Sequence, residues 1–224
     1  MLRTPIGPVT KSVVYLHPFA EEMHKSRRMA ALQAAALATA GCATLSVDLT
    51  GCGDSGGDFA DASWSVWRRD AVTAIAWLKA RFDRCVTLWG LRTGATLATD
   101  VAVDRDDIES LMLWQPVLIG EMFLNQFLRI RLAAEMFQDA GKQTSTLEYR
   151  GRLARGESIE VAGYCLTSAM ARDLAGIVLG DFTPACPVRW FEVGRIARQA
   201  ISPAGDKVVE RWRAKGMSVI ARTV

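Results

Sequence analysis

Short apolar runs alternate with helix-like segments through the first half of this chain, and this alternation limits the possible folds more than any other feature. Strands are predicted at residues 12–16 (SVVYL), 43–48 (ATLSVD), 86–89 (VTLW) and 110–114 (SLMLW). Helices are predicted between them at residues 27–40, 64–81 and 93–103, with Ser26 as the N-cap of the first. Strand–helix–strand units make right-handed crossovers, so the pattern predicts an α/β protein with a mostly parallel sheet and helices on both faces.

The pattern changes in the second half of the chain. Residues 121–140 and 146–154 have the spacing of amphipathic helices, and no strand is predicted in residues 121–173. We interpret residues 120–176 as a helical cap insertion lying over the sheet. The sheet is then completed by a strand at 188–193, a helix at 206–214 and a strand at 218–224. Residues 1–224 are thus expected to form a single domain that carries this insertion.

The composition excludes several classes of partner. Half of the 224 residues are hydrophobic and 23% are charged, which is typical of a folded globular domain. The net charge of +3 is small and no basic block is interleaved with aromatic residues, so a nucleic-acid partner is not expected. No apolar stretch is long enough to span a bilayer, and the N-terminus lacks the apolar core of a signal peptide.

The cysteines point to a reducing compartment. There are five, widely spaced and without a C-x-x-C pair, which argues against a zinc or redox site. We therefore expect a cytoplasmic protein without a metal or cofactor. The oligomeric state is left open.

Three loops follow the carboxyl ends of predicted strands, where ligands bind in open parallel sheets. They are residues 17–24 (HPFAEEMH), residues 50–57 (TGCGDSGG) and the turn within residues 89–95 (WGLRTGA). In this turn Gly90 and Gly94 flank Arg92 with the spacing of G-x-S-x-G, in which the glycines let the backbone fold tightly around a nucleophilic serine. An arginine side chain stays protonated near neutral pH and cannot attack a carbonyl carbon.

The order and spacing of YLHPF, DLTGCGDS and GLRTG resemble the α/β-hydrolase superfamily. More narrowly, the chain is similar to the exosortase A system-associated hydrolases, type 2 group, over about residues 13–170. The segments that carry this similarity are HPFAEEMHKSRRMAALQ, DLTGCGDSGGDF, LWGLRTGA, LWQPV, QFLRIRLAAEMF and ESIEVAGYCLTSAM. The resemblance implies the α/β-hydrolase fold, hydrolysis, and a bacterial setting of protein sorting and extracellular polysaccharide synthesis. It also implies an elbow in which arginine takes the place of serine.

The residues of a serine–histidine–acid triad are missing from their expected places. Arg92 stands where the serine would be. The predicted strand 188–193 is followed by residues 194–199 (GRIARQ), which contain no carboxylate, and no histidine follows the last predicted strand. The two histidines of the sequence are His17 and His24, both in the first loop.

Arg92 has two interpretations. It is either a structural residue, bonded to loop carbonyls or to Glu21 or Glu22, or an anion site at a helix N-terminus. In the second case Phe19, Glu22 and Thr93 are the further ligand-binding candidates. An ion pair between Arg92 and either glutamate would neutralise the pocket and weaken the anion-site hypothesis.

Three residues are candidates for catalysis. His17 or Glu21 could act as a general base for water, and Cys52 could replace the serine nucleophile. Each also has a structural explanation. His17 can be a hydrogen-bonded loop histidine, Glu21 a solvated acid, and Cys52 a small residue between two glycines.

Two functions follow from these observations. The first is hydrolysis of an ester or thioester, with an acyl or acetyl group on a carbohydrate precursor as the substrate that the family resemblance implies. The alternative is a non-catalytic accessory protein that binds an anionic small molecule or partner around Arg92.

Overall fold

The chain forms two compact units in the computed structural model, which describes residues 1–138, 145–194 and 200–224. The first, here called the sheet unit, comprises Met1–Leu49, Arg68–Leu118 and Leu179–Val224. The second, the helical unit, comprises Thr50–Trp67 and Ile119–Val178.

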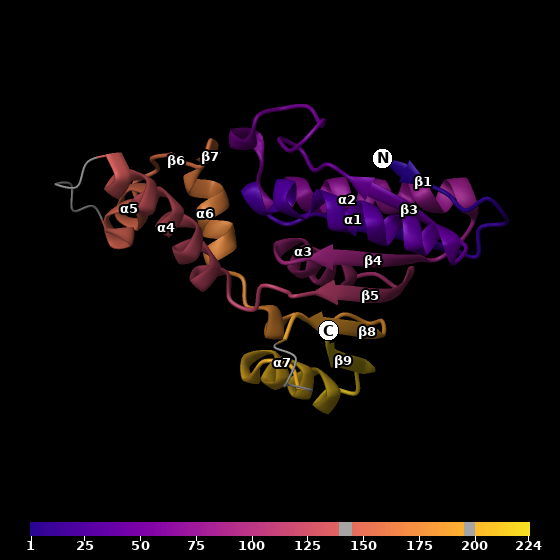
Figure 1. Ribbon diagram of the computed structural model, residues 1–224. Helices are drawn as coiled ribbons and strands as arrows, with labels where there is room; N and C mark the ends of the chain where they lie inside the picture. Colours follow the sequence, from indigo (N-terminus) through magenta and orange to yellow (C-terminus); the bar gives the residue numbers. More distant parts are fainter. Residues whose placement is uncertain (139–144, 195–199) are drawn as a thin grey trace. The chain divides into compact units, whose positions relative to one another are not determined.

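A seven-stranded sheet forms the centre of the sheet unit (Figure 1), with the strand order β1-β3-β2-β4-β5-β8-β9. The strands are β1 (Leu2–Arg3), β2 (Lys11–Leu16), β3 (Cys42–Val47), β4 (Val86–Leu91), β5 (Ile108–Trp114), β8 (Val188–Glu192) and β9 (Val219–Thr223). All neighbouring pairs are parallel except β1 with β3. This confirms the predicted mostly parallel sheet, although the two-residue β1 was not predicted.

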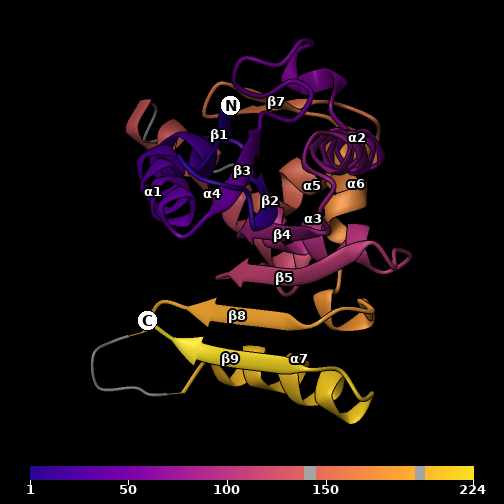
Figure 2. The same cartoon turned by 90° about the vertical axis from the view of Figure 1, so that its right-hand side faces the viewer.

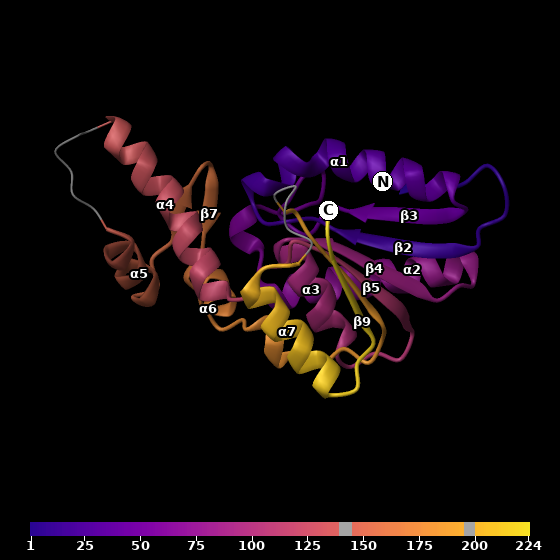
Figure 3. The same cartoon turned by 60° about the horizontal axis from the view of Figure 1, so that its bottom comes forward.

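The helices of the sheet unit cover both faces of the sheet. They are α1 (Glu21–Thr39), α2 (Trp64–Phe82, which begins in the helical unit), α3 (Thr93–Ala102) and α7 (Pro203–Ala214). Along the sheet, α1 connects β2 to β3 in one direction, whereas α2, α3 and α7 connect their strands in the other. Because such crossovers are right-handed, α1 lies on one face and the other three lie on the opposite face. Figure 2 shows α1 on one side of the strands and α2 and α3 on the other, and Figure 3 shows α7 beside β9.

Two helices of the sheet unit begin earlier than predicted: α7 starts at Pro203 and not at 206, and α1 differs more. The first turn of α1 is at Glu21, six residues before the predicted start, and Ala20 precedes it without a side-chain cap. Ser26, the predicted N-cap, lies inside the helix, where its hydroxyl donates to the carbonyl oxygen of Met23 at 3.1 Å. That prediction was wrong because the polar segment EEMHKS looked like loop, whereas acidic residues in a first helical turn are favoured by the helix dipole.

The helical unit contains α4 (Gly120–Gln138), α5 (Thr146–Ala154), α6 (Ser168–Ala175), the 3₁₀ turn η1 (Phe59–Asp61) and the strands β6 (Ile159–Val161) and β7 (Tyr164–Leu166). The predicted helix 146–154 is confirmed, and the last two residues of the predicted helix 121–140 lie outside the described residues. No strand was predicted in residues 121–173. The strands β6 and β7 lie in this range, so that prediction was wrong. Placement of residues 120–176 as a cap over the sheet stays a prediction.

The β6–β7 hairpin escaped prediction because each strand has three residues, too few to show an alternating pattern. Its two-residue turn is Ala162–Gly163, and both residues have positive φ, 51° and 85°. This is the backbone geometry of a tight antiparallel hairpin.

None of the described helices is both long and apolar enough to cross a lipid bilayer.

Candidate functional site

The turn between β4 and α3 has the geometry expected of a nucleophile elbow. Arg92 alone separates Leu91, the last residue of β4, from Thr93, the first of α3. Its backbone has φ 56° and ψ −119°, a conformation that is costly for a residue with a side chain and is held by its surroundings. The Arg92 N–H donates to the Trp114 carbonyl at 2.9 Å, and the Arg92 carbonyl accepts from the Ala95 N–H at 3.1 Å. Strand β5 and the first turn of α3 therefore fix Arg92 in this conformation.

Both glycines of the turn are required by sterics. A Cβ atom added to Gly90 would collide with the carbonyl oxygen of Gly94 and the backbone of Ala95. A Cβ atom added to Gly94 would collide with the carbonyl oxygen of Leu16, at the end of β2. The spacing seen in the sequence therefore reports a real close approach of β2, β4 and α3 at this edge of the sheet.

Arg92 forms an ion pair with Glu22. The Nε of Arg92 donates to Oε1 of Glu22 at 3.2 Å, and the two side chains are 28% and 27% exposed. The second carboxylate oxygen of Glu22 is buried and has no hydrogen-bond partner among the described residues. Burial raises the pKa of Glu22, and the charge of Arg92 opposes this shift. The sequence left open whether Arg92 pairs with Glu21 or with Glu22, and the structure shows the pair with Glu22.

Glu21 has a different partner from Glu22. The Nζ of Lys25, one helical turn away, lies 3.6 Å from Oε1 of Glu21. Successive residues of a helix point about 100° apart, which separates the directions of the two carboxylates. Glu22, predicted as a ligand-binding residue, is therefore the carboxylate bonded to Arg92, and Glu21, the predicted base, pairs with Lys25.

The starts of α1 and α3 have the same backbone form. Ala20, before α1, has φ 49° and ψ −126°, close to the values of Arg92 before α3. The first N–H groups of each helix lack partners within the helix and carry the positive end of its dipole. The Glu22–Arg92 ion pair joins these two helix starts. The arrangement favours negative charge that develops near them.

The two remaining ligand-binding candidates are buried at these helix starts. Phe19 is fully buried, and its carbonyl accepts from the Glu22 N–H at 3.1 Å. Thr93 is 3% exposed, and its hydroxyl has no hydrogen-bond partner among the described residues. No ligand contact is needed to explain the burial of Phe19, because it packs in the core.

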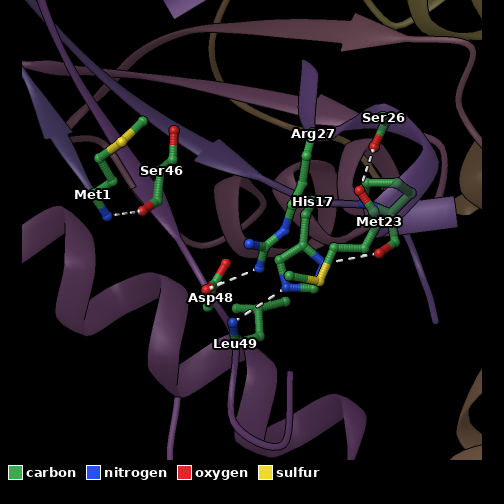
Figure 4. A network of polar contacts seen from close by, with 9 residues as sticks. Met1, His17, Met23, Ser26, Arg27, Ser46, Asp48 and Leu49 are labelled. Atoms are coloured by element: carbon green, nitrogen blue, oxygen red, sulfur yellow. Dashed lines mark hydrogen bonds and ion pairs between the residues drawn. The ribbon is translucent and has the colours of Figure 1, made fainter. Parts of the chain in front are cut away.

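His17 is held in place through both ring nitrogens (Figure 4). Its Nε2 accepts from the Leu49 N–H at 3.2 Å, so the ring proton is on Nδ1, which donates to the Pro18 carbonyl at 2.8 Å. Burial lowers the pKa of His17. The ring is therefore neutral and links the β2 loop to the end of β3, and both nitrogens are committed to backbone groups. This arrangement fits a structural role and provides no site for accepting a proton from water.

An ion pair lies beside His17 in the same view. Arg27 of α1 donates from Nη2 to Oδ2 of Asp48 at 3.3 Å, directly after β3. Together with the Leu49 N–H bond, it ties α1 and the β2 loop to the residues that follow β3.

Cys52 belongs to the helical unit, in the loop that follows Leu49. It is 4% exposed, and its carbonyl accepts from the Ser55 N–H at 3.1 Å. Gly51 before it has φ 75°, and a Cβ atom there would collide with the carbonyl of Asp58. The tight loop accounts for a small residue at position 52. In the described part of the chain, no cluster of three or more His, Cys, Asp or Glu side chains could hold a metal ion.

Glu192 is a buried carboxylate at the end of β8, near the position where a triad acid would follow this strand. Its Oε1 accepts from Nε1 of Trp190 at 2.9 Å and from the Ser202 hydroxyl at 3.2 Å, and its Oε2 accepts from the Ser202 N–H at 2.7 Å. Residues 195–199, which contain no carboxylate, lie outside the described residues. These contacts give Glu192 a structural role at the start of α7. The sequence placed Glu192 inside a predicted strand and gave no sign of these contacts.

Comparison with known proteins agrees with this geometry. A family model described as serine aminopeptidase, S33 matches residues 7–158. No curated protein matches the chain.

Solved structures show a similar fold at low sequence identity. Est1E from Butyrivibrio proteoclasticus, with ferulic acid bound, is 18% identical over 100% of this chain and 84% of its own, with a TM-score of 0.72. A thermostable carboxyl esterase from Bacillus coagulans is 15% identical over 99% and 83%, with a TM-score of 0.64. The α/β hydrolase domain-containing protein 10 from mouse is 16% identical over 97% and 81%, with a TM-score of 0.58. The sheet unit and its elbow therefore have the α/β-hydrolase fold.

Proposed function

Because the chain belongs to the serine aminopeptidase S33 family of α/β hydrolases, we propose that it hydrolyses an ester or thioester bond with water activated by Glu22 instead of a serine nucleophile. The observation that carries this proposal is the Arg92–Glu22 ion pair at the elbow, 3.2 Å between Nε and Oε1. It places a carboxylate beside the position where the fold usually presents its nucleophile.

The properties of Glu22 suit a general base. Its second carboxylate oxygen makes no hydrogen bond with described residues. Its pKa is raised by burial, which brings its basicity closer to what proton transfer near neutral pH requires. The ion pair with Arg92 opposes this shift by favouring the ionised carboxylate. His17 is a weaker candidate, since both of its nitrogens bond to backbone groups.

The proposed reaction proceeds in two steps. A water oxygen attacks the carbonyl carbon while one of its protons passes to Oε2 of Glu22, and the carbonyl π electrons move to the carbonyl oxygen. Backbone N–H groups at the starts of α3 and α1 stabilise this oxyanion. The tetrahedral intermediate then expels the alkoxide or thiolate, which takes the proton from Glu22. The products are a carboxylic acid and an alcohol or thiol, and Glu22 returns to its ionised form.

The proposed substrate is a small acyl ester or thioester. Support comes from the neighbouring structures, of which one, Est1E, has ferulic acid bound and another is a carboxyl esterase. The resemblance to the exosortase A system-associated hydrolases supports an acyl or acetyl group on a bacterial polysaccharide precursor. We propose a cytoplasmic location from the five widely spaced cysteines, which favour a reducing compartment.

The alternative, a non-catalytic protein that binds anions at Arg92, is less well supported. Glu22 already neutralises the guanidinium, so a ligand anion would have to compete with a carboxylate held on α1. In that case phosphate or acetate would raise the melting temperature of the wild type and not of Arg92→Gln, because a ligand selective for the folded state stabilises it.

The test is hydrolysis of p-nitrophenyl acetate and of an acetyl thioester by the wild type, Glu22→Gln and Glu21→Gln. Removing a general base typically costs about 100-fold or more in rate, so Glu22→Gln should lose most of its activity. Glu21→Gln is the matched control, because it makes the same substitution one residue away, and it should keep wild-type activity. An inactive wild type, or equal rates in the two variants, would reject the proposal.

A further inference from the structure

Gln115 is a second strained residue beside the elbow, and the reaction proposed above gives it no role. It directly follows β5, whose last residue, Trp114, pairs in register with Leu91 of β4. Its φ is 44°, a value that is costly for a residue with a side chain. Ala20 after β2 and Arg92 after β4 also have positive φ. Strained residues therefore follow three strands that are neighbours in the sheet (Figure 2), and such clusters are typical of functional sites.

Hydrogen bonds to the end of β8 hold Gln115 in this conformation. Its N–H donates to the Phe191 carbonyl at 2.7 Å, and its side-chain Oε1 accepts from the Val193 N–H at 2.8 Å. The second bond identifies the oxygen end of the amide, because only Oε1 can accept from an N–H. The position of the Nε2 amino group of Gln115 is fixed in the same way.

The Nε2 group of Gln115 carries two hydrogen-bond donors. Gln115 is partly exposed, and in residues 1–138, 145–194 and 200–224 the side chain has its one hydrogen bond through Oε1. Because the amide is already held in one orientation, an oxygen atom of a ligand could accept from Nε2 with little further loss of side-chain entropy. The group is thus suited to recognise an oxygen atom of a substrate.

Gln115 and Glu22 lie on opposite sides of Arg92 along the sheet. The strand order is β2-β4-β5, with Glu22 on the helix that follows β2 and Gln115 at the end of β5. The Arg92 N–H and carbonyl bond to Trp114 and Val117, which flank Gln115 closely in the chain. The attacking oxygen and the leaving group occupy different corners of a tetrahedral intermediate. With the water beside Glu22, the leaving group is therefore directed toward the Gln115 side of the elbow.

We propose that Gln115 is a specificity-determining residue, which donates from Nε2 to an oxygen atom on the alcohol part of an ester substrate. This assignment rests on the proposed function, because it places the leaving group by reference to Glu22. It narrows the substrates to esters whose alcohol carries a second oxygen close to the ester bond, as the alcohols of polyols and carbohydrates do. A hydrocarbon alcohol would leave both donors unpaired and would lose this hydrogen bond.

The experiment compares two acetate esters of nearly equal size, ethylene glycol monoacetate and propyl acetate, which differ by a hydroxyl in place of a methyl group. Release of acetic acid is followed by titration at constant pH, and kcat and KM are measured for each ester. One hydrogen bond at a partly exposed site should raise kcat/KM of the wild type for ethylene glycol monoacetate about fivefold over propyl acetate. The gain should lie mainly in KM, because the bond is made equally in the bound substrate and in the transition state.

Two variants remove the donors of Gln115 in different ways. Gln115→Glu keeps an oxygen that can accept from the Val193 N–H, and Gln115→Met is uncharged and similar in length. Both should abolish the preference between the esters, and Gln115→Met should stay within about twofold of the wild type on propyl acetate. Gln33→Met is the matched control, the same substitution at a partly exposed glutamine of α1, and it should keep the preference. Urea unfolding shows whether each variant is folded.

The outcomes distinguish the role of Gln115 from that of Glu22. Equal kcat/KM for the two esters in the wild type, or a preference that survives in either variant of Gln115, would overturn the inference. An equal loss on both esters would assign Gln115 to support of the elbow and would also overturn it. A preference that depends on Gln115, with rates unchanged in Glu22→Gln, would support Gln115 and reject Glu22 as the base. A wild type inactive on both esters would overturn the inference, and its activity on p-nitrophenyl acetate shows separately whether the proposed function holds.

Discussion

Arg92 and Glu22 form an ion pair at 3.2 Å although 69 residues lie between them in the sequence, and they stand at the starts of two different helices, α3 and α1. The pair occupies the position at which this fold usually presents a nucleophile. Its consequences for structure and chemistry can be tested separately.

The first prediction concerns the elbow backbone. Gly94→Ala should lower the free energy of unfolding by about 2–3 kcal/mol, because the new Cβ atom would collide with the Leu16 carbonyl and neither backbone can move away easily. Urea unfolding followed by circular dichroism measures this. Gly7→Ala is the control, since no atom lies within 4 Å of a Cβ there. Equal stabilities of the two variants would contradict the close packing of α3 on β2.

The second prediction concerns the protonation of His17. Its pKa is lowered from 6.5 by burial, so the folded protein binds this proton less readily than the unfolded chain. His17 therefore costs stability as the pH falls through 6.5, and the cost is absent above that value. Between about pH 7.5 and pH 5.5 the urea midpoint of the wild type should fall more than that of His17→Gln. An equal fall of the urea midpoint in the wild type and in His17→Gln would contradict the burial of a neutral His17 ring.

A third prediction concerns the buried acid of β8. Glu192→Ala leaves the Trp190 Nε1–H and the Ser202 N–H without their acceptor, so it should cost about 3 kcal/mol of unfolding free energy. Ser202→Ala removes the N-cap of α7 and should cost about 1 kcal/mol. Ester hydrolysis per folded molecule should stay at the wild-type rate in Ser202→Ala. A large loss of activity in a well-folded Ser202→Ala protein would show that this region contributes to the reaction.

The fourth prediction distinguishes direct attack by water from covalent catalysis. If Glu22 activates water, no acyl group becomes attached to the protein during turnover. Intact-mass spectrometry of samples quenched during hydrolysis of p-nitrophenyl acetate should therefore show the unmodified mass. A species heavier by one acetyl group, absent in Cys52→Ala or in Thr93→Val, would instead identify that side chain as a nucleophile.

The sequence was sufficient to predict the main sheet and the elbow. The alternation of apolar runs and helical segments depends on local spacing, and the positions of Gly90 and Gly94 report a local steric need. The start of α1 was missed because it depends on the strained backbone of Ala20, which no residue type announces. The β6–β7 hairpin was missed because three-residue strands carry too little pattern.

The roles of the site residues depended on contacts between distant segments. Which glutamate meets Arg92 follows from where α1 begins, since neighbouring residues of a helix point in different directions. The partner of His17 is the N–H of Leu49, 32 residues away, and a backbone group leaves no signal in the sequence. Sequence patterns could therefore identify the loop that meets the elbow, and the contacts of each side chain required the three-dimensional structure.

The pH dependence of kcat/KM tests the central claim, catalysis by Glu22 beside Arg92, most directly. For the wild type the rate should rise with pH through an inflection above 4.5, the ordinary glutamate value, because burial raises the pKa of Glu22. In Arg92→Gln the inflection should move to higher pH, since the positive charge that favours the ionised carboxylate is gone. Glu22→Gln should lack the inflection. An inflection at the same pH in the wild type and Arg92→Gln, or one that persists in Glu22→Gln, would contradict the account.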